Sequence, residues 1–315
     1  MAKVFKLKFW VGLGLILMLL VTAGCSGYVS PQGNGGAAQP TLMDAAKSAY
    51  FVDVTWLKEH SDQVLILDAR GEAEYNKGHI SGALNSPWQM FANMNAQPGQ
   101  PGWGTLLDQK ELATKLGALG IDGKKIIIVY ADPKGWGEDG RIVWMLRMAG
   151  LQNSKMLDGG WKTWAAGKNA VTKDVPVVHA TTLAISSLDQ EFNATTEWIL
   201  GNKSKIKIVD SRSRKEYDGA TDFGESRGGH LPQAALISFT DTFNSDGTVK
   251  STEDLKKLFS AAGLQPDNEI VTYCTAGIRS AHMALLLRMA GYDKARNYDA
   301  SFYEWAGKSS LEVLK

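Results

Sequence analysis

The sequence predicts an α/β protein of two similar domains, each with a mainly parallel β-sheet flanked by helices. The chain has 315 residues, about twice the common domain size, so two hydrophobic cores are expected. Its second half repeats the first at an offset of about 142 residues. Within each repeat, short apolar runs alternate with amphipathic segments, which is typical of a parallel sheet covered on both faces.

The N-terminal segment indicates export. Residues 1–24 are predicted to be a signal peptide, because three lysines precede an apolar run that ends in small residues. The run is shorter than the about 20 residues that a spanning helix needs. TAGC resembles the lipobox of bacterial lipoproteins, in which the cysteine is diacylated, so Cys25 is expected to attach the protein to a membrane surface. Ordinary signal cleavage is the alternative.

Export and lipidation together predict a lipoprotein of the cell envelope that is anchored to a membrane and faces the periplasm. Residues 25–45 are rich in Gly, Pro, Ser and Ala, a composition typical of a flexible tether. Removal of the three lysines changes the formal charge from +1 to −2. With 44% hydrophobic and 21% charged residues and this near-neutral charge, the composition gives no support for a nucleic-acid partner.

The repeats predict a first domain over residues 46–170 and a second over residues 191–315, with a linker over residues 171–190. Buried strands are expected at four apolar runs: VLILD (64–68), KIIIVY (125–130), IKIVD (206–210) and EIVTY (269–273). Each repeat then has an amphipathic segment that ends at a Gly suited to a helix C-terminus: RIVWMLRMAG (141–150) and SAHMALLLRMAG (280–291).

The matched segments resemble a known family. In the second repeat DSR, EYDG, SRGGHLPQA, a cysteine loop after a strand, and a helix ending in MAGY follow in order. The first repeat has DAR, EYNKGHISGA and MAG. This order is similar to the tandem rhodanese domains of thiosulfate and mercaptopyruvate sulfurtransferases. The resemblance implies that the first domain is catalytically empty and helps to form the cleft, and that no metal or organic cofactor is required.

Cys274 is the candidate nucleophile. Alignment of VYADP with TYCTA places Ala131 at the matching position, so only the second repeat has a thiol there. If Cys25 is acylated, Cys274 has no disulfide partner. An unpaired cysteine in an exported protein is more often a reactive residue than an inert residue of the core. Sulfur transfer needs a thiolate that can hold sulfur as a persulfide. A loop entering a helix, expected to begin near Ser280, stabilises that charge.

The active-site loop is expected to comprise Thr275, Ala276, Gly277, Ile278 and Arg279. Gly277 permits its tight curl. Arg279 either faces an anionic substrate or closes the loop through a salt bridge. Related phosphatases have seven residues from Cys to Arg, and the six in this chain resemble the sulfur-handling members. Thr275 and Ala276 replace the basic residues or the Gly-Ser of the two tandem types, which leaves the sulfur donor open.

The resemblance implies further roles in the second repeat. Asp210 is expected near the active loop, and Arg212 is expected to pair with Glu216 as scaffold. Arg227 matches a substrate-facing arginine, with an ordinary solvated charge as the alternative. His230 is expected to be scaffold.

In the first repeat, Asp68 and His79 are minor candidates for a proton relay, by their resemblance to residues of the mercaptopyruvate type. His79 is otherwise expected to be scaffold. No metal site is expected, because no Cys, His or Asp cluster with ligand spacing accompanies the histidines.

The tryptophans divide into two groups. Trp144, Trp161, Trp164 and Trp305 lie in or beside apolar helical segments and are expected to pack in the core. Trp136 lies in the longer loop of the first repeat, so it either overhangs the cleft between the domains or lies on the surface.

These observations predict a sulfurtransferase that takes sulfane sulfur from a donor such as thiosulfate or 3-mercaptopyruvate and passes it to a thiol or cyanide. Two alternatives stay open. One is a non-catalytic interaction module in which the cysteine senses redox state. The other is the handling of selenium or tellurium oxyanions in the envelope by the same thiolate.

Overall fold

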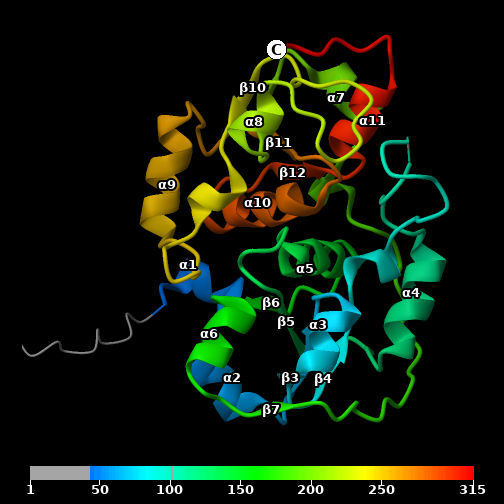
Figure 1. Ribbon diagram of the computed structural model, residues 1–315, viewed down its shortest axis with the longest axis vertical. Coiled ribbons are helices and arrows are strands. Elements are labelled where there is room, and N and C mark those ends of the chain that lie inside the picture. The colour runs from blue at the N-terminus through cyan, green and yellow to red at the C-terminus, as the bar shows by residue number, and fades with distance from the viewer. Residues whose placement is uncertain (1–42, 101) are drawn as a thin grey trace, which may run out of the picture. The chain divides into compact units, whose positions relative to one another are not determined.

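A computed structural model describes residues 43–100 and 102–315 of the chain. The predicted signal peptide, Cys25 and most of the tether lie outside these residues. Residues 43–315 form one compact unit with two α/β halves (Figure 1). Among the helices of this described part, none has the length and hydrophobicity that a membrane crossing requires.

The first half is a five-stranded sheet in the order β1-β6-β5-β2-β4, with every pairing parallel. Its strands are β1 (Phe51–Val52), β2 (Val64–Asp68), β4 (Ala83–Asn85), β5 (Ile126–Tyr130) and β6 (Ser154–Leu157). Its helices are α1 (Ala45–Ser48), α2 (Val54–His60), α3 (Glu72–Lys77), the 3₁₀ helix η1 (Trp88–Phe91), α4 (Gln109–Ala118), α5 (Glu138–Met148) and α6 (Gly160–Ala166).

The second half repeats this plan. Read from the other edge, its all-parallel sheet runs β8-β12-β11-β9-β10, which matches the first sheet strand for strand. Its strands are β8 (Asn193–Ala194), β9 (Ile206–Asp210), β10 (Ala234–Leu236), β11 (Glu269–Tyr273) and β12 (Ala295–Tyr298). Its helices are η2 (Gln190–Phe192), α7 (Thr196–Asn202), α8 (Arg214–Tyr217), η3 (Phe239–Thr242), α9 (Thr252–Ala261), α10 (Ile278–Met289) and α11 (Ser301–Gly307).

The expected central strands are confirmed, and their register is the same in both halves. In the first sheet Asp68 of β2 lies opposite Tyr130 of β5. In the second, Asp210 of β9 lies opposite Tyr273 of β11. Because the strands are parallel, the carboxyl ends of the central strands lie together at one edge of each sheet. Ligands bind at this edge in such sheets.

One hydrophobic cluster extends across both halves, and each half has a further buried cluster of its own. Helices α5 and α10 pack against each other between the two sheets (Figure 1). Trp144 and Met145 of α5 belong to the same buried cluster as Leu285 and Leu286 of α10. Each such side chain contributes about 1.5–3 kcal/mol when fully buried, so the halves are held firmly together. The first half can therefore position groups around a site in the second.

The expected core tryptophans are mostly buried. Trp144, Trp164 and Trp305 are between 0% and 5% exposed. Trp161 is half-buried and stacks on the guanidinium of Arg70, with 4.0 Å between the guanidinium carbon and the ring centroid.

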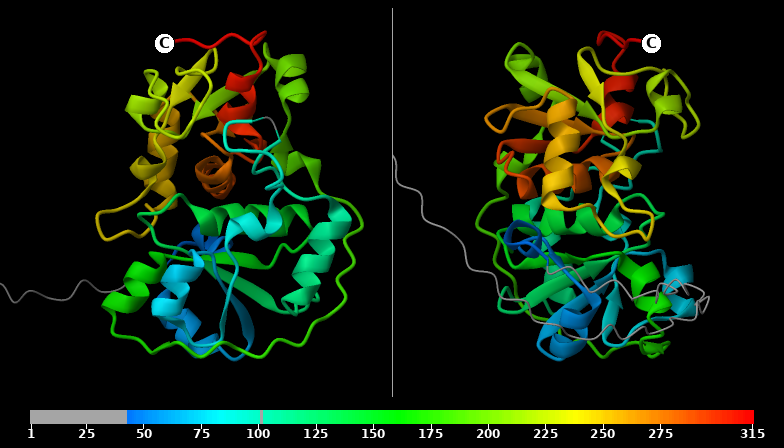
Figure 2. Two further views of the ribbon diagram at one scale, coloured as in Figure 1. Left: turned by 45° about the vertical axis from the view of Figure 1, so that its right-hand side comes forward. Right: turned by 90° about the vertical axis from the view of Figure 1, so that its left-hand side faces the viewer.

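The predicted linker is partly a strand. β7 (Val171–Thr172) pairs with β3 (His79–Ile80) in a small antiparallel sheet. Residues 173–189, all of them described, contain no helix or strand and run along the outside of the first half (Figure 2). The backbone N–H of Thr181 donates to the carbonyl of Gly117 at 2.8 Å, so this segment is fixed to helix α4.

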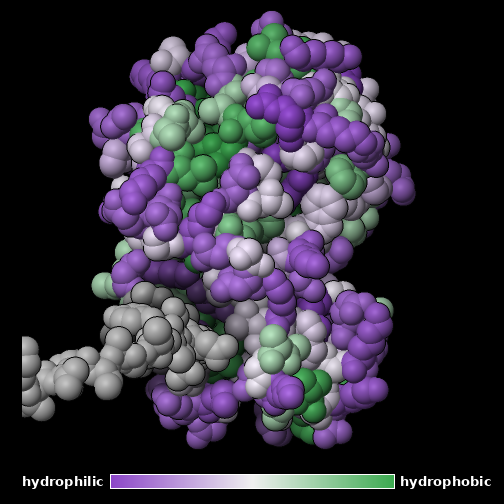
Figure 3. Space-filling view, turned by 60° about the vertical axis from the view of Figure 1, so that its left-hand side comes forward, coloured by the Kyte–Doolittle hydropathy of each residue, from purple (hydrophilic) through white to green (hydrophobic). Residues whose placement is uncertain are grey.

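Figure 3 shows a face that is mostly hydrophilic, with hydrophobic side chains gathered in its upper half.

Candidate functional site

Cys274 directly follows β11 and is 2% exposed. The loop ends at Gly277, whose φ of +77° lies in the left-handed region. A Cβ at this position would lie 2.2 Å from the carbonyl oxygen of Asp299, so only glycine fits. Helix α10 begins at Ile278, two residues before the expected Ser280, because the glycine starts the helical turn immediately.

The segment after β12 holds the loop from the side. The Cys274 N–H donates to Ser301 Oγ at 2.9 Å. The carbonyls of Cys274 and Thr275 accept from the N–H groups of Phe302 and Tyr303, each at 3.0 Å. Ser301 has a φ of +55°, which is uncommon for a residue with a Cβ, and it is fully buried. This strained serine fixes the backbone of the nucleophile.

The surroundings of the Cys274 thiol favour the thiolate. Burial alone would raise the pKa of Cys274, but the positive charge of Arg279 and the N–H groups of Ser280 and Ala276 outweigh burial, so the pKa lies below its ordinary value of 9.0. The Ser280 hydroxyl lies 3.6 Å from Cys274 Sγ and 2.7 Å from the side-chain carbonyl of Asn297. The site therefore supplies the reactive form of the sulfur.

Arg279 is in a salt bridge, which is one of the two roles expected for it. Its guanidinium donates to both carboxylate oxygens of Glu216, at 2.9 and 2.7 Å, and to Thr275 Oγ1 at 2.9 Å. Its carbon lies 4.6 Å from the centroid of a Trp136 ring. Burial raises the pKa of Glu216, but hydrogen bonds and charge from Arg279, with hydrogen bonds from Ser213, outweigh it and hold the pKa at about 2.

The expected pairing of Arg212 with Glu216 is wrong. Arg212 instead pairs with Asp210 at 2.7 Å and donates to the carbonyl of Gly229 at 2.7 Å. Asp210 also accepts from the Tyr273 hydroxyl, and Tyr273 directly precedes Cys274. Arg212 is scaffold as expected, but its partner is the aspartate two residues before it, because Glu216 faces the active loop.

Asp68 and His79 belong to the matching scaffold of the first half. Asp68 pairs with Arg70 at 2.5 Å, as Asp210 does with Arg212. His79 stacks on Tyr75 with ring centroids 3.7 Å apart, and its Nε2 lies 3.1 Å from the carbonyl of Asp174. Neither Asp68 nor His79 is among the residues around Cys274, so the structure does not bring the two relay candidates to the nucleophile.

His230 and Arg227 also lie away from the thiol. His230 stacks on Tyr217 with ring centroids 3.6 Å apart, a scaffold role as expected. Arg227 is not among the residues that line the Cys274 cavity, and it is not simply solvated. Its guanidinium donates to four backbone carbonyls near the C-terminal end of α11: those of Trp305, Ala306, Lys308 and Leu311, at 2.8–3.1 Å. Capping these carbonyls uses the guanidinium, which explains why it is not directed at the cavity.

A cavity of about 260 Å³ opens in front of Cys274. Both halves of the chain line it, and the residues are Trp88, Gln89, Trp103, Trp136, Glu138, Phe223, Cys274, Thr275, Ala276, Ile278, Arg279 and Tyr303. Trp136 therefore overhangs the cleft, which is one of its two expected places. Trp88, Trp103, Phe223, Tyr303 and Glu138 were not expected, because they come from separate segments that share no motif.

The first half also holds the active loop from behind. Arg141 of α5 donates to the carbonyl of Gly277 at 3.4 Å and to that of Gly104 at 3.0 Å, and it forms an ion pair with Asp299. Ala131 has the place of Cys274 in the first half. Its carbonyl accepts a hydrogen bond from the backbone N–H of Trp161 at 2.9 Å, as the Cys274 carbonyl does from the backbone N–H of Phe302. The first half, which has no cysteine at the matching position, thus keeps the scaffold of the second half and supports its active-site loop.

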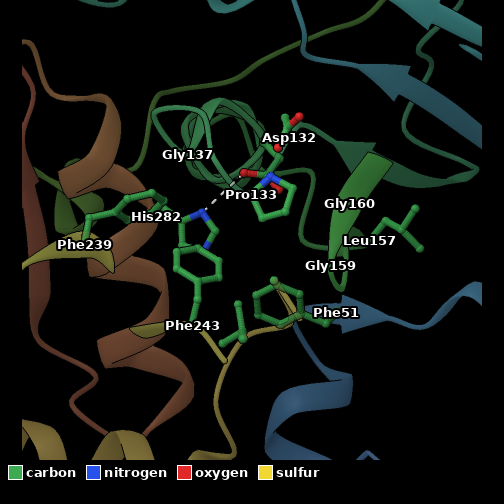
Figure 4. A pocket seen from close by; sticks show the side chains of 13 residues that line it. Phe51, Asp132, Pro133, Gly137, Leu157, Gly159, Gly160, Phe239, Phe243 and His282 are labelled. Atoms are coloured by element: carbon green, nitrogen blue, oxygen red, sulfur yellow. Dashed lines mark hydrogen bonds and ion pairs between the residues drawn. The ribbon is translucent and has the colours of Figure 1, made fainter. Parts of the chain in front are cut away.

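A second cavity, of about 10 Å³, lies between the halves (Figure 4). His282 faces it among Phe51, Phe239 and Phe243, and its Nδ1 lies 3.3 Å from Asp139 Oδ1. This volume holds about one water molecule and no organic substrate. Within residues 43–100 and 102–315, no three His, Cys, Asp or Glu side chains are grouped so that they could hold a metal ion.

Comparison with known proteins agrees with the duplicated plan. The sequence model described as "Rhodanese-like domain" matches residues 53–167 and 195–308. The chain is 28% identical over 289 residues to "Sulfur carrier protein TtuD" of Thermus thermophilus, covering 87% of this chain and 99% of that protein. It is 29% identical over 254 residues to "Thiosulfate sulfurtransferase" of Azotobacter vinelandii, covering 80% and 91%.

Two solved structures show the same fold at low sequence identity. YnjE superposes with a TM-score of 0.75 at 20% identity, over 85% of this chain and 69% of that one. The anaerobic ergothioneine biosynthesis enzyme of Chlorobium limicola superposes with a TM-score of 0.76 at 17% identity, over 85% and 70%.

Proposed function

Because the chain belongs to the rhodanese-like domain family, we propose that it is a sulfurtransferase that holds transferred sulfur on Cys274. Similarity to a protein named thiosulfate sulfurtransferase supports the activity. The observation that carries the proposal is a cysteine with a lowered pKa on a closed loop that faces a cavity. The first half contributes cavity wall and support for the loop, and no nucleophile.

The proposed reaction has two steps. The Cys274 thiolate attacks the outer sulfur of a donor such as thiosulfate, forming an S–S bond while the donor's S–S bond breaks and sulfite leaves with the bonding electrons. An acceptor thiolate or cyanide then attacks the outer sulfur of the persulfide, and the Cys274 thiolate leaves. Loop N–H groups and Arg279, which lower the pKa of Cys274, also stabilise the negative persulfide.

Mass spectrometry of the purified protein tests the first step. After treatment with thiosulfate or 3-mercaptopyruvate, the peptide that contains Cys274 is expected to gain the mass of one sulfur atom. Cys274→Ser is the matched control and is expected to gain none. If no donor adds sulfur to the wild-type peptide, the proposal fails and a non-catalytic module becomes the better account.

The donor follows less directly from the site. Among the described residues around the cavity, Arg279 is the one basic side chain, and Glu216 neutralises it. A doubly negative donor such as thiosulfate therefore meets no uncompensated positive charge. We propose thiosulfate and 3-mercaptopyruvate as the donors to compare, with their kcat/KM values deciding between them.

We also propose that the protein is exported and anchored in the cell envelope through lipid on Cys25. The support is the signal-like N-terminus and the TAGC sequence. Cys25→Ala is expected to move the protein from the membrane fraction to the soluble fraction of the periplasm. Unchanged membrane association of this variant would refute the lipid anchor without affecting the sulfur chemistry.

A further inference from the structure

Five aromatic side chains form the walls of the Cys274 cavity, in perpendicular pairs. The ring centroids of Trp88 and Trp103 are 5.8 Å apart at 82°, and those of Trp103 and Tyr303 are 5.5 Å apart at 78°. Trp136 and Phe223 form a third pair at 4.9 Å and 87°. Trp136 and Phe223 are exposed, so they form the opening, whereas Trp88 and Tyr303 are buried and lie deeper. Aromatic rings therefore border the cavity both at its opening and deeper inside.

The charges around this cavity are predominantly negative. Arg279 supplies one positive charge, which stabilises the Cys274 thiolate and which the bidentate bond to Glu216 balances toward any further anion. The Cys274 thiolate or its persulfide adds a negative charge. The carboxyl group of Glu138, from the first half, also lines the cavity, and its Oε2 accepts a hydrogen bond from the backbone N–H of Trp136 at 2.9 Å. A small dianion gains little in such a site, whereas a cation gains from both the rings and the carboxylate.

We propose that the cavity selects an organic cation, so that the organic sulfur compound that exchanges sulfur with Cys274 has an alkylammonium or similar positive group. This inference rests on the proposed function. Aromatic faces attract cations through their ring quadrupoles, most strongly where water is excluded. Trp136 already makes this contact with Arg279, whose guanidinium carbon lies 4.6 Å from the ring centroid.

Glu138 gives the preference a dependence on pH. Burial, with the nearby charges of Asp139 and Asp132, raises the pKa of Glu138 to about 7, although backbone N–H groups oppose the rise. The carboxyl group therefore becomes negative as the pH increases through 7. The other titratable groups that line the cavity do not oppose this change. Arg279 stays positive, the Tyr303 hydroxyl stays neutral because burial raises its pKa to about 12, and the lowered pKa of Cys274 favours the thiolate. Cation binding is expected to be stronger at pH 8 than at pH 6.

Three small probes of similar shape test the proposal on the full chain: benzyltrimethylammonium, benzyl alcohol and benzenesulfonate. Each is titrated while the rate of iodoacetamide alkylation of Cys274 is followed by peptide mass spectrometry, so protection reports binding in this cavity. The cation is expected to bind about 2- to 30-fold more tightly than the neutral probe, and the anion more weakly than both. Equal affinities, or tighter binding of benzenesulfonate, would overturn the proposal.

Variants locate the source of the preference. Glu138→Gln is expected to reduce cation affinity and abolish its increase between pH 6 and pH 8, with no change for benzyl alcohol. Glu59→Gln, an exposed residue of α2 outside the cavity, removes the same charge as a matched control and is expected to change nothing. Trp103→Leu is expected to reduce cation affinity more than that of the neutral probe. Retention of full cation selectivity in Glu138→Gln and Trp103→Leu would overturn the proposal.

The two proposals fail separately. Sulfur loading of Cys274 by an inorganic donor, seen as a mass gain, tests the sulfurtransferase alone. If loading occurs but the probes show no charge preference, the sulfurtransferase stands and the organic cation is refuted. If no donor loads Cys274, the reaction fails whatever the probes show.

Discussion

Replacing Glu216 by Gln is expected to destabilise the protein most strongly at neutral pH. Glu216 is 3% exposed, and both carboxylate oxygens accept hydrogen bonds from Arg279. Its pKa is about 2 in the folded chain, against an ordinary value of 4.5. A difference of about 2.5 pH units at 1.36 kcal/mol each corresponds to about 3 kcal/mol of folding free energy from the ionised carboxylate.

The direction of the pH dependence follows from the lowered pKa of Glu216. Its contribution is complete above pH 4.5 and is lost as the pH falls through 2. The same two values leave about 2 kcal/mol at pH 3.5. Urea unfolding of wild type and Glu216→Gln at pH 7 and pH 3.5 is therefore expected to give a difference in unfolding free energy that shrinks by about 1 kcal/mol in acid.

An exposed ion pair provides the control. Glu253 lies 3.7 Å from Lys257 on the surface of α9, and exposed pairs contribute about 0–1 kcal/mol. Glu253→Gln is therefore expected to change the unfolding free energy little at either pH. A Glu216→Gln effect that is equal at pH 7 and pH 3.5, or no larger than that of the control, would refute the assignment of Glu216 as the ionised partner of Arg279.

Three further predictions concern the active loop. Arg279→Met removes the positive charge that lowers the pKa of Cys274, so the midpoint of the pH profile for iodoacetamide alkylation is expected to rise, while Arg279→Lys restores part of the shift; an unchanged midpoint in Arg279→Met would contradict this role of the guanidinium. Gly277→Ala places a Cβ 2.2 Å from the Asp299 carbonyl, so a lower Tm and slower sulfur loading are expected; an unchanged Tm would contradict the tight fit. Arg141→Ala leaves Asp299 without its buried partner and is expected to reduce the unfolding free energy by about 3–5 kcal/mol, measured by urea unfolding, with sulfur loading slower in the remaining folded protein.

The fold was predictable because it depends on local patterns. The run VLILD coincides with β2 and IKIVD with β9, since an apolar β-branched run has few other ways to bury its side chains. The position of Cys274 at the end of β11 followed from the same pattern. The repeat also identified Ala131 as its inactive counterpart. These features need only the order of residues along the chain.

The wrong and missing assignments depend on contacts between distant segments. Glu216 lies 63 residues from Arg279 in the sequence, and nothing local chooses between Arg279 and Arg212 as its partner. Arg227 was expected either to face a substrate or to be solvated, but it caps carbonyls 78–84 residues away. Ser301 acts through a backbone conformation that its identity does not indicate. Such pairings are decided by packing, which the sequence pattern does not specify.

The cavity wall is the clearest example. Trp88, Trp103 and Trp136 come from three separate segments of the first half, and Phe223 and Tyr303 from two of the second. Taken alone in the sequence, each of these residues looks like an ordinary buried or surface aromatic residue. The packing of the two halves against each other, including α5 against α10, brings the two sets to one cavity, so neither repeat predicts it by itself.

A single-turnover transfer experiment tests the central claim most directly. The protein is loaded with a sulfur donor, freed of excess donor, and mixed with cyanide, and the thiocyanate formed is measured against the amount of protein. Transfer through Cys274 predicts one thiocyanate per loaded chain and disappearance of the sulfur mass from the peptide that contains Cys274, with no thiocyanate from Cys274→Ser. Thiocyanate formation by Cys274→Ser, or a loaded wild-type chain that yields none, would contradict the claim.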